Sequence, residues 1–162
     1  MLELLPRARK VADLFAGCGT FSLALARKAK VHAVEQNGAA LAALALGARA
    51  PGLKPVTTEV RDLFALPLGG PELAGPESGG PESGGFDAVV LDPPRAGARQ
   101  QVAMLAASPV PVIVYVSCDP ASFARDAALL VRGGYAMGPV LPVDQFLWSS
   151  HIELVAGFTR TR

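Results

Sequence analysis

The 162 residues suffice for one compact core, so we expect a single domain over residues 1–162. With 51% hydrophobic and 18% charged residues, the composition excludes a disordered tail or a coiled coil. A formal net charge of +1 predicts weak stand-alone binding to nucleic acid, because cationic side chains supply most non-specific affinity for phosphates.

The chain has no run of about 20 apolar residues and no signal-peptide pattern, so we expect a cytoplasmic protein that makes no membrane contact. Cys18 and Cys118 are its two cysteines, which are too few for a four-cysteine metal site or a disulfide framework. We therefore expect no metal in this chain, and one of the two thiols is open to a catalytic interpretation.

Two strand–helix units open the chain. An apolar strand at 11–15 breaks at the glycine turn 17–19, and helical spacing follows over 20–30. A second strand at 31–35 ends on an acid, and Asn37 can cap a helix that runs to about residue 48. Successive units of this kind predict an α/β domain with a parallel sheet.

The alternation continues to the end of the chain. Further strands are expected at 54–60, 86–91, 110–116, 135–143 and 151–158, and further helices at 97–107 and 121–131. This gives about seven strands and four helices, with the last two strands as a closing pair. The interval 69–85 repeats Gly-Pro-Glu-Ser-Gly-Gly, which cannot bury apolar area and predicts a flexible, poorly ordered surface loop.

Polar and reactive residues gather at the predicted strand ends. They are the segment 13–19, Glu35, Asp62, Asp92 and Cys118. Ligands of an open parallel sheet bind beyond the carboxyl ends of its strands, so these residues predict one shared site.

The glycine turn is the first candidate binding element. Gly17 and Gly19 stand where the chain must turn sharply and let a ligand approach the backbone, and Glu35 could bind a ribose diol. Dinucleotide-binding domains and purely structural turns share this pattern. Because the three-glycine phosphate fingerprint is absent, S-adenosylmethionine is favoured over a pyrophosphate ligand.

The segment Asp92-Pro93-Pro94-Arg95 is the second candidate. Its two prolines lock a rigid extended turn, which fixes a carboxylate and a guanidinium relative to the strand end. Rigid display of charge indicates a role facing the substrate, and a stiff loop with a surface ion pair is the alternative.

Four segments carry a resemblance to a known family. They are Asp13-Leu-Phe-Ala-Gly-Cys-Gly-Thr-Phe21, Asp92-Pro-Pro-Arg-Ala-Gly97, Tyr115-Val-Ser-Cys-Asp-Pro120 with Ala124-Arg-Asp126, and His151-Ile-Glu153. Over about residues 11–158 the chain resembles the methyltransferase domain of the RNA uracil-5-methyltransferases, which modify tRNA or 23S rRNA. The resemblance implies a Rossmann-like S-adenosylmethionine-dependent methyltransferase fold, with a seven-stranded, mostly parallel sheet and a closing antiparallel pair.

The resemblance also implies a mechanism. C5 of uracil is too weak a nucleophile to take a methyl group unaided, so a thiolate must first add to C6. The family match gives this role to Cys118, removal of the C5 proton to Glu153, and contact with the uracil edge or help in enolate formation to Asp92. Without the match, Cys118 would be interpreted as an inert buried thiol and Glu153 as surface charge.

The remaining assignments follow from the same match. Cofactor binding is expected at Asp13, Phe15, Gly17, Gly19, Thr20, Glu35, Asp62 and Asp92. Asp62 resembles the acid that meets the adenine, while Pro93, Arg95 and His151 are expected at the substrate. His151 could instead orient Glu153 or only pack between strands, and Cys18 is expected to have no catalytic role.

Full-length members of the family carry upstream an RNA-binding β-barrel and often an iron–sulfur cluster, which this chain lacks, so it looks like an incomplete enzyme with an RNA substrate. Two alternatives stay open: methylation of another RNA atom, such as a guanine ring nitrogen or cytosine C5, and a cofactor-binding domain that is inactive without its substrate-recognition parts. The sequence leaves the target uridine and the oligomeric state undetermined.

Overall fold

The computed structural model describes residues 2–5, 7–75, 85–144, 148 and 151–161. Its strands are β1 (Lys10–Leu14), β2 (Lys30–Glu35), β3 (Val56–Val60), β4 (Ala88–Leu91), β5 (Val112–Ser117), β6 (Tyr135–Met137), β7 (Leu141–Val143) and β8 (Glu153–Arg160). Its helices are the 3-10 turn η1 (Leu2–Leu4), α1 (Thr20–Ala26), α2 (Gly38–Gly47), α3 (Pro71–Ala74), α4 (Arg99–Ala106) and α5 (Pro120–Arg132).

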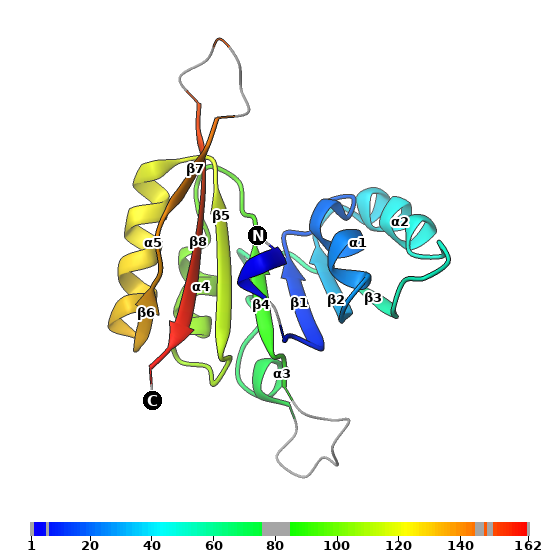
Figure 1. Cartoon of the computed structure of the whole chain (residues 1–162), viewed down its shortest axis with the longest axis horizontal. Helices are drawn as coiled ribbons and strands as arrows, with labels where there is room; N and C mark the ends of the chain where they lie inside the picture. The colour runs from blue at the N-terminus through cyan, green and yellow to red at the C-terminus, as the bar shows by residue number, and fades with distance from the viewer. Residues whose placement is uncertain (1, 6, 76–84, 145–147, 149–150, 162) are drawn as a thin grey trace.

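All eight strands belong to one sheet, in the order β3-β2-β1-β4-β5-β8-β6, with β7 also paired to β8 (Figure 1). Strands β1 to β5 pair in parallel, and β8 runs antiparallel to β5, β6 and β7. The Rossmann-like α/β fold with a mostly parallel sheet that the sequence predicts is therefore confirmed. The expected strand at 135–143 is broken in two, because Gly138 and Pro139 interrupt it and proline cannot donate to a strand ladder.

The alternation of side chains along the strands separates two buried layers. Val11, Val90 and Val114 face the layer that holds η1 and α1, and they pack with Leu25 of α1. The neighbouring strand residues face the opposite layer, which contains residues of α3, α4 and α5. Among the described residues, no helix is both long and apolar enough to cross a membrane.

The interval 69–85 departs from the expected surface loop in its first part. The short helix α3 lies within it. Leu73 of α3 is 1% exposed and belongs to the same buried layer as residues of α4. The Phe86 amide donates to the Leu73 carbonyl at 3.2 Å, so the segment is tied to the start of β4. Part of the expected loop is therefore helical, because Leu73 gives residues 71–74 an apolar anchor. Residues 76–84 lie outside the described part of the chain.

Candidate functional site

The carboxyl edge of the parallel strands brings together the residues that the sequence marked. The glycine turn follows β1, Glu35 ends β2, Asp62 follows β3, Asp92 follows β4 and Cys118 follows β5. Because β8 is antiparallel, its first residue, Glu153, lies at the same edge. The sheet order divides this edge into one half formed by β3, β2 and β1 and another formed by β4, β5 and β8.

The glycine turn adopts left-handed backbone geometry. The φ angles are 63° at Phe15, 54° at Gly17 and 98° at Gly19. A Cβ added to Gly19 would lie 2.7 Å from Leu44 Cγ, so the turn packs against α2 more closely than any side chain allows. Glu35 steadies the turn, because its carboxylate accepts the Gly17 amide at 3.2 Å.

Glu35 and Asn37 link the turn to the next helix. The second carboxylate oxygen of Glu35 accepts the Asn37 amide at 2.9 Å. The Asn37 side chain in turn accepts the amides of Ala39 and Ala40 as the cap of α2, which confirms the predicted capping residue. The carboxylate of Glu35 is therefore held at the mouth of the turn.

An aromatic pair lies where β1 and β3 end. The rings of Phe15 and Phe64 have centroids 5.4 Å apart and a tilt of 54°. Phe64 is 37% exposed and follows Asp62, whose carboxylate accepts the Phe64 amide at 2.9 Å. Sequence analysis missed Phe64, although its position two residues beyond a strand-end acid, at the edge shared with Phe15, was a usable signal. The pair forms an apolar surface between the glycine turn and Asp62.

Three carboxylates form the centre of the site. Asp13 is fully buried; burial raises its pKa to about 7, and the nearby charge of Asp92 contributes in the same direction, against the hydrogen bond from Ser22. Burial raises the pKa of Asp92 to about 6, and the charge of Glu153 adds to the rise. The backbone explains the proximity, because the Asp92 amide donates to the Leu14 carbonyl at 3.3 Å. Carboxylates with raised pKa values can exchange protons near neutral pH.

Two of these carboxylates keep oxygen atoms without partners. Asp13 Oδ1 and Glu153 Oε2 are buried and make no hydrogen bond within the described residues. A buried, unsatisfied carboxylate oxygen is costly, so such atoms mark positions at which a ligand can donate.

Cys118 directly follows β5, and Glu153 begins β8, the antiparallel neighbour of β5. In the antiparallel register of β5 and β8, Val116 opposes Val155 and Ser117 opposes Leu154. Cys118 and Glu153 are the next residues beyond this last pair, so they occupy neighbouring positions at the ends of the two strands. Directly opposed residues of an antiparallel pair have Cβ atoms about 5 Å apart. Cys118 is half-buried and carries a free thiol, so a thiol and a carboxylate stand at adjoining strand ends.

The start of α5 fixes the Cys118 backbone on its other side. Asp119 caps the helix, because its carboxylate accepts the Ser122 amide at 2.7 Å, and this hydrogen bond lowers the pKa of Asp119. The Ser117 hydroxyl accepts the Asp119 amide at 3.2 Å. Cys118 is thus held between a strand end and a helix cap.

The buried Asp126 fastens the Asp92-to-Gly97 segment. Its carboxylate accepts the Ala98 amide and the Tyr115 hydroxyl, each at 2.8 Å, and the Arg125 Nε at 2.9 Å. Arg125 also donates to the Ala96 carbonyl at 2.9 Å. Gly97 has a φ of 75°, and a Cβ there would lie 2.6 Å from Asp126 Oδ2. The Ala-Arg-Asp motif, to which sequence analysis gave no role, thus holds the segment that carries Asp92.

The expected substrate residues also meet at this half of the edge. Arg95 and His151 are exposed, and a terminal guanidinium nitrogen of Arg95 lies 2.9 Å from His151 Nε2. Pro93 is buried. Thr20 is exposed at the first position of α1, and Cys18 is exposed within the glycine turn. Within the described ranges, no cluster of three or more His, Cys, Asp or Glu side chains could hold a metal ion.

Comparison with known proteins adds a second line of evidence. A sequence model for a family described as tRNA (Uracil-5-)-methyltransferase matches residues 82–160. An RNA methyltransferase of Mesorhizobium japonicum is 54% identical over 159 residues, which is 98% of this chain and 36% of that protein. The 23S rRNA (uracil(1939)-C(5))-methyltransferase RlmD of Chromohalobacter salexigens is 42% identical, over 97% of this chain and 31% of that protein.

A solved structure gives the same relationship. The Pyrococcus abyssi tRNA (uracil-54, C5)-methyltransferase, in complex with S-adenosyl-L-homocysteine, superposes with a TM-score of 0.75 at 31% identity. The match covers 93% of this chain and 34% of that one. The chain therefore spans about a third of the length of each of these three proteins.

Proposed function

The chain belongs to the RNA (uracil-5-)-methyltransferase family, and on this premise we propose that it is the catalytic part of an enzyme that methylates C5 of a uridine in tRNA or 23S rRNA. The observation that carries the proposal is that Cys118 and Glu153 are the next residues beyond the last pair of the β5–β8 register, Ser117 with Leu154. Methylation of a ring nitrogen would need neither group, so this pairing favours carbon methylation.

The β3–β2–β1 half of the edge fits S-adenosylmethionine, the cofactor of this family. The left-handed glycine turn exposes backbone, the Glu35 carboxylate stands at its mouth, and Asp13 Oδ1 lacks a partner. The residues that would hold the cofactor are Asp13, Phe15, Gly17, Gly19, Thr20, Glu35, Asp62 and Asp92. When bound, S-adenosylmethionine supplies an electrophilic methyl group. The Phe15–Phe64 pair offers the apolar surface that an adenine ring requires.

The β4–β5–β8 half supplies the groups that act on the uracil. The Cys118 thiolate forms a bond to C6, which makes C5 nucleophilic enough to accept a methyl group. Glu153 then takes the proton from C5, the sulfur–C6 bond breaks, and the thiolate is restored. A neutral Asp92 can donate a hydrogen bond to the uracil carbonyl as negative charge develops there, and the raised pKa of Asp92 favours this form.

The remaining substrate contacts are assigned to Arg95, Pro93 and His151. Arg95 and His151 are exposed and lie within hydrogen-bonding distance of each other, so they can contact the RNA around the target base. C6 is shielded inside a stacked duplex, so the target uridine must be unpaired or flipped out of the stack. Pro93 holds this rim in an extended conformation.

Covalent trapping tests the proposal. The chain is incubated with S-adenosylmethionine and with tRNA or 23S rRNA transcripts that contain 5-fluorouridine, and adducts are located by mass spectrometry. Fluorine at C5 cannot leave as a proton does, so an adduct on Cys118 should accumulate. Cys118→Ala should abolish it, while Cys18→Ala, at the exposed cysteine of the glycine turn, should leave it intact.

A parallel incubation with the full-length Mesorhizobium japonicum relative separates two causes of a negative result. An adduct on that protein alone would mean that this chain is an inactive cofactor-binding part of the enzyme. An adduct on neither protein would contradict the thiol mechanism and favour methylation at another RNA atom.

A further inference from the structure

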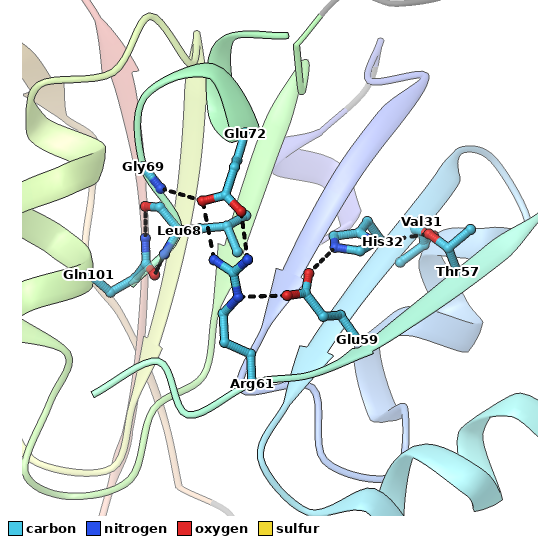
Figure 2. Close-up of polar contacts among 9 residues, drawn as sticks. All are labelled: Val31, His32, Thr57, Glu59, Arg61, Leu68, Gly69, Glu72 and Gln101. Atoms are coloured by element: carbon cyan, nitrogen blue, oxygen red, sulfur yellow. Dashed lines mark hydrogen bonds and ion pairs between the residues drawn. The ribbon is translucent and has the colours of Figure 1, made fainter. Parts of the chain in front are cut away.

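A polar cluster beneath the cofactor half of the edge is unused by the proposed mechanism. Figure 2 shows Arg61 between two carboxylates, Glu59 of β3 and Glu72 of α3. Arg61 Nε donates to Glu59 at 2.6 Å, and its two terminal nitrogens donate to the two oxygens of Glu72. The Arg61 side chain is 13% exposed, so this guanidinium is largely withdrawn from water.

Arg61 and Glu72 stand at the two ends of one connecting segment. Residues 62–71 leave β3 and reach α3, and the Arg61–Glu72 pair closes the segment at its base. Glu72 also accepts the Gly69 amide, and Gln101 of α4 binds both the amide and the carbonyl of Leu68, at 2.8 and 2.9 Å (Figure 2). The segment is therefore fixed at three points.

This segment carries the wall of the cofactor site. Asp62 follows Arg61 directly, and Phe64 comes two residues later. The Phe64 ring packs on Phe15. The Arg61 amide also donates to the Glu35 carbonyl at 3.0 Å, so the same residue is attached to the strand that presents the Glu35 carboxylate. Arg61 thus connects the two acids that are assigned to the ribose and the adenine.

The bond geometry explains why arginine is needed. A guanidinium offers five donors in a rigid plane and can bind two carboxylates at once, whereas a lysine ammonium cannot hold both in a fixed plane. The pKa of Arg61 is raised, chiefly by its hydrogen bond to Glu72, so the cation persists at any ordinary pH.

We infer that Arg61 is a positioning residue for the cofactor: the Arg61–Glu72 clamp presets Asp62 and Phe64 and thereby sets the affinity for the adenosyl group. The inference rests on the proposed function, because it requires the cofactor at this half of the edge. An opened clamp lowers the fraction of molecules that can bind, and the apparent Kd rises by the reciprocal of that fraction.

Titration of the chain with S-adenosylhomocysteine by calorimetry tests the clamp. If Arg61→Met leaves about a fifth of the molecules competent, Kd rises about fivefold. Glu72→Gln, a milder change at a side chain 47% exposed, should weaken binding in the same direction. Arg132→Met, at an exposed arginine that ends α5, is the matched control and should leave Kd unchanged.

Two further Kd measurements distinguish a positioning role of Arg61 from a general effect on stability. Since Arg61→Met and Glu72→Gln open the same clamp, the double variant should bind no more weakly than the weaker single variant. Arg61→Lys keeps the positive charge but loses the planar set of donors, so its Kd should lie nearer to that of Arg61→Met than to that of wild type. Urea unfolding of each variant confirms that it is folded at the titration temperature.

The outcomes are distinct. If the wild-type chain binds S-adenosylhomocysteine and both single variants have the same Kd as wild type, the clamp is overturned and the proposed function stands. Additive losses in the double variant would also overturn it, because independent effects need no shared clamp. A folded wild-type chain that fails to bind S-adenosylhomocysteine would overturn the cofactor assignment and the clamp together.

Discussion

Two buried aspartates lie in the same small domain and have opposite surroundings. Asp126 and Asp13 are both 0% exposed. Asp126 accepts hydrogen bonds from a hydroxyl, an amide and a guanidinium, whereas Asp13 accepts one from Ser22 and keeps Oδ1 without a partner. A buried carboxylate with a complete set of donors stabilises the fold, while one with an open oxygen costs stability and is available to a ligand.

The position of each aspartate agrees with this division. Asp126 lies in the middle of α5, and it accepts the Ala98 amide just after the segment that carries Asp92. Asp13 lies in β1 next to the glycine turn, with the charge of Asp92 nearby. The contrast therefore assigns Asp126 to the scaffold and Asp13 to the site.

Removal of the Asp126 carboxylate should have the largest effect. Asp126→Ala leaves the Tyr115 hydroxyl and the Ala98 amide without an acceptor and should lower the free energy of unfolding by about 3–5 kcal/mol. Urea unfolding measures the change. Asp119→Ala, which removes only the cap of α5, is the control and should lose about 1 kcal/mol. Equal losses would remove the distinction between a buried acceptor and a surface cap.

Replacement of Asp13 should instead raise the free energy of unfolding. Its pKa of about 7 in the folded chain lies above the ordinary value of 3.8, so the folded state binds the extra proton between these values. Stability from this group is therefore complete at low pH and falls as the pH rises towards 7. Asp13→Asn removes that loss and should stabilise the chain by about 2–4 kcal/mol at pH 8.

The pH dependence is the diagnostic part of the Asp13 experiment. Urea unfolding of Asp13→Asn and wild type at pH 5 and pH 8 should give a difference that grows with pH. Asp144→Asn, at an exposed carboxylate, controls for the loss of one charge. A stabilisation of the same size at both pH values would contradict the assignment of a raised pKa to Asp13.

The shared location of the site residues could be predicted from the sequence, but the partners of the buried charges could not. Asp92 and Cys118 follow apolar strands, and parallel strands bring their ends to one edge, so a common location could be predicted from order alone. The partners of Asp126 could not, because Tyr115 and Ala98 reach it from other elements, up to 28 residues away. The same holds for Arg61 and Glu72, since Glu72 lies in a segment whose composition predicted a flexible loop.

The backbone at Gly97 offers a smaller perturbation of the Asp126 side. Gly97→Ala combines a φ of 75° with a Cβ only 2.5 Å from an Arg125 nitrogen and 2.6 Å from Asp126, and should destabilise by about 2–3 kcal/mol. Gly52→Ala shares the left-handed backbone, with a φ of 83°, but its Cβ would meet nothing within 4 Å. That control should lose about 1 kcal/mol. Equal losses in thermal or urea unfolding would mean that Asp126 and Arg125 shift to accommodate the new methyl group.

The smallest expected effect is loss of a single donor to Asp126. Burial and the Asp126 hydrogen bond raise the pKa of Tyr115, so its hydroxyl remains a donor throughout the usual pH range. Hydrogen bonds to charged groups contribute more than those to neutral carbonyls, and Tyr115→Phe should lower the unfolding free energy by about 2 kcal/mol. Tyr135→Phe removes a buried hydroxyl that donates to the Val110 carbonyl at 2.7 Å and should lose about 1 kcal/mol. A larger loss at Tyr135 would mean that the carboxylate charge adds nothing to the Tyr115–Asp126 hydrogen bond. A Tyr115→Phe loss that vanishes in the Asp126→Ala background would locate the effect in this one contact.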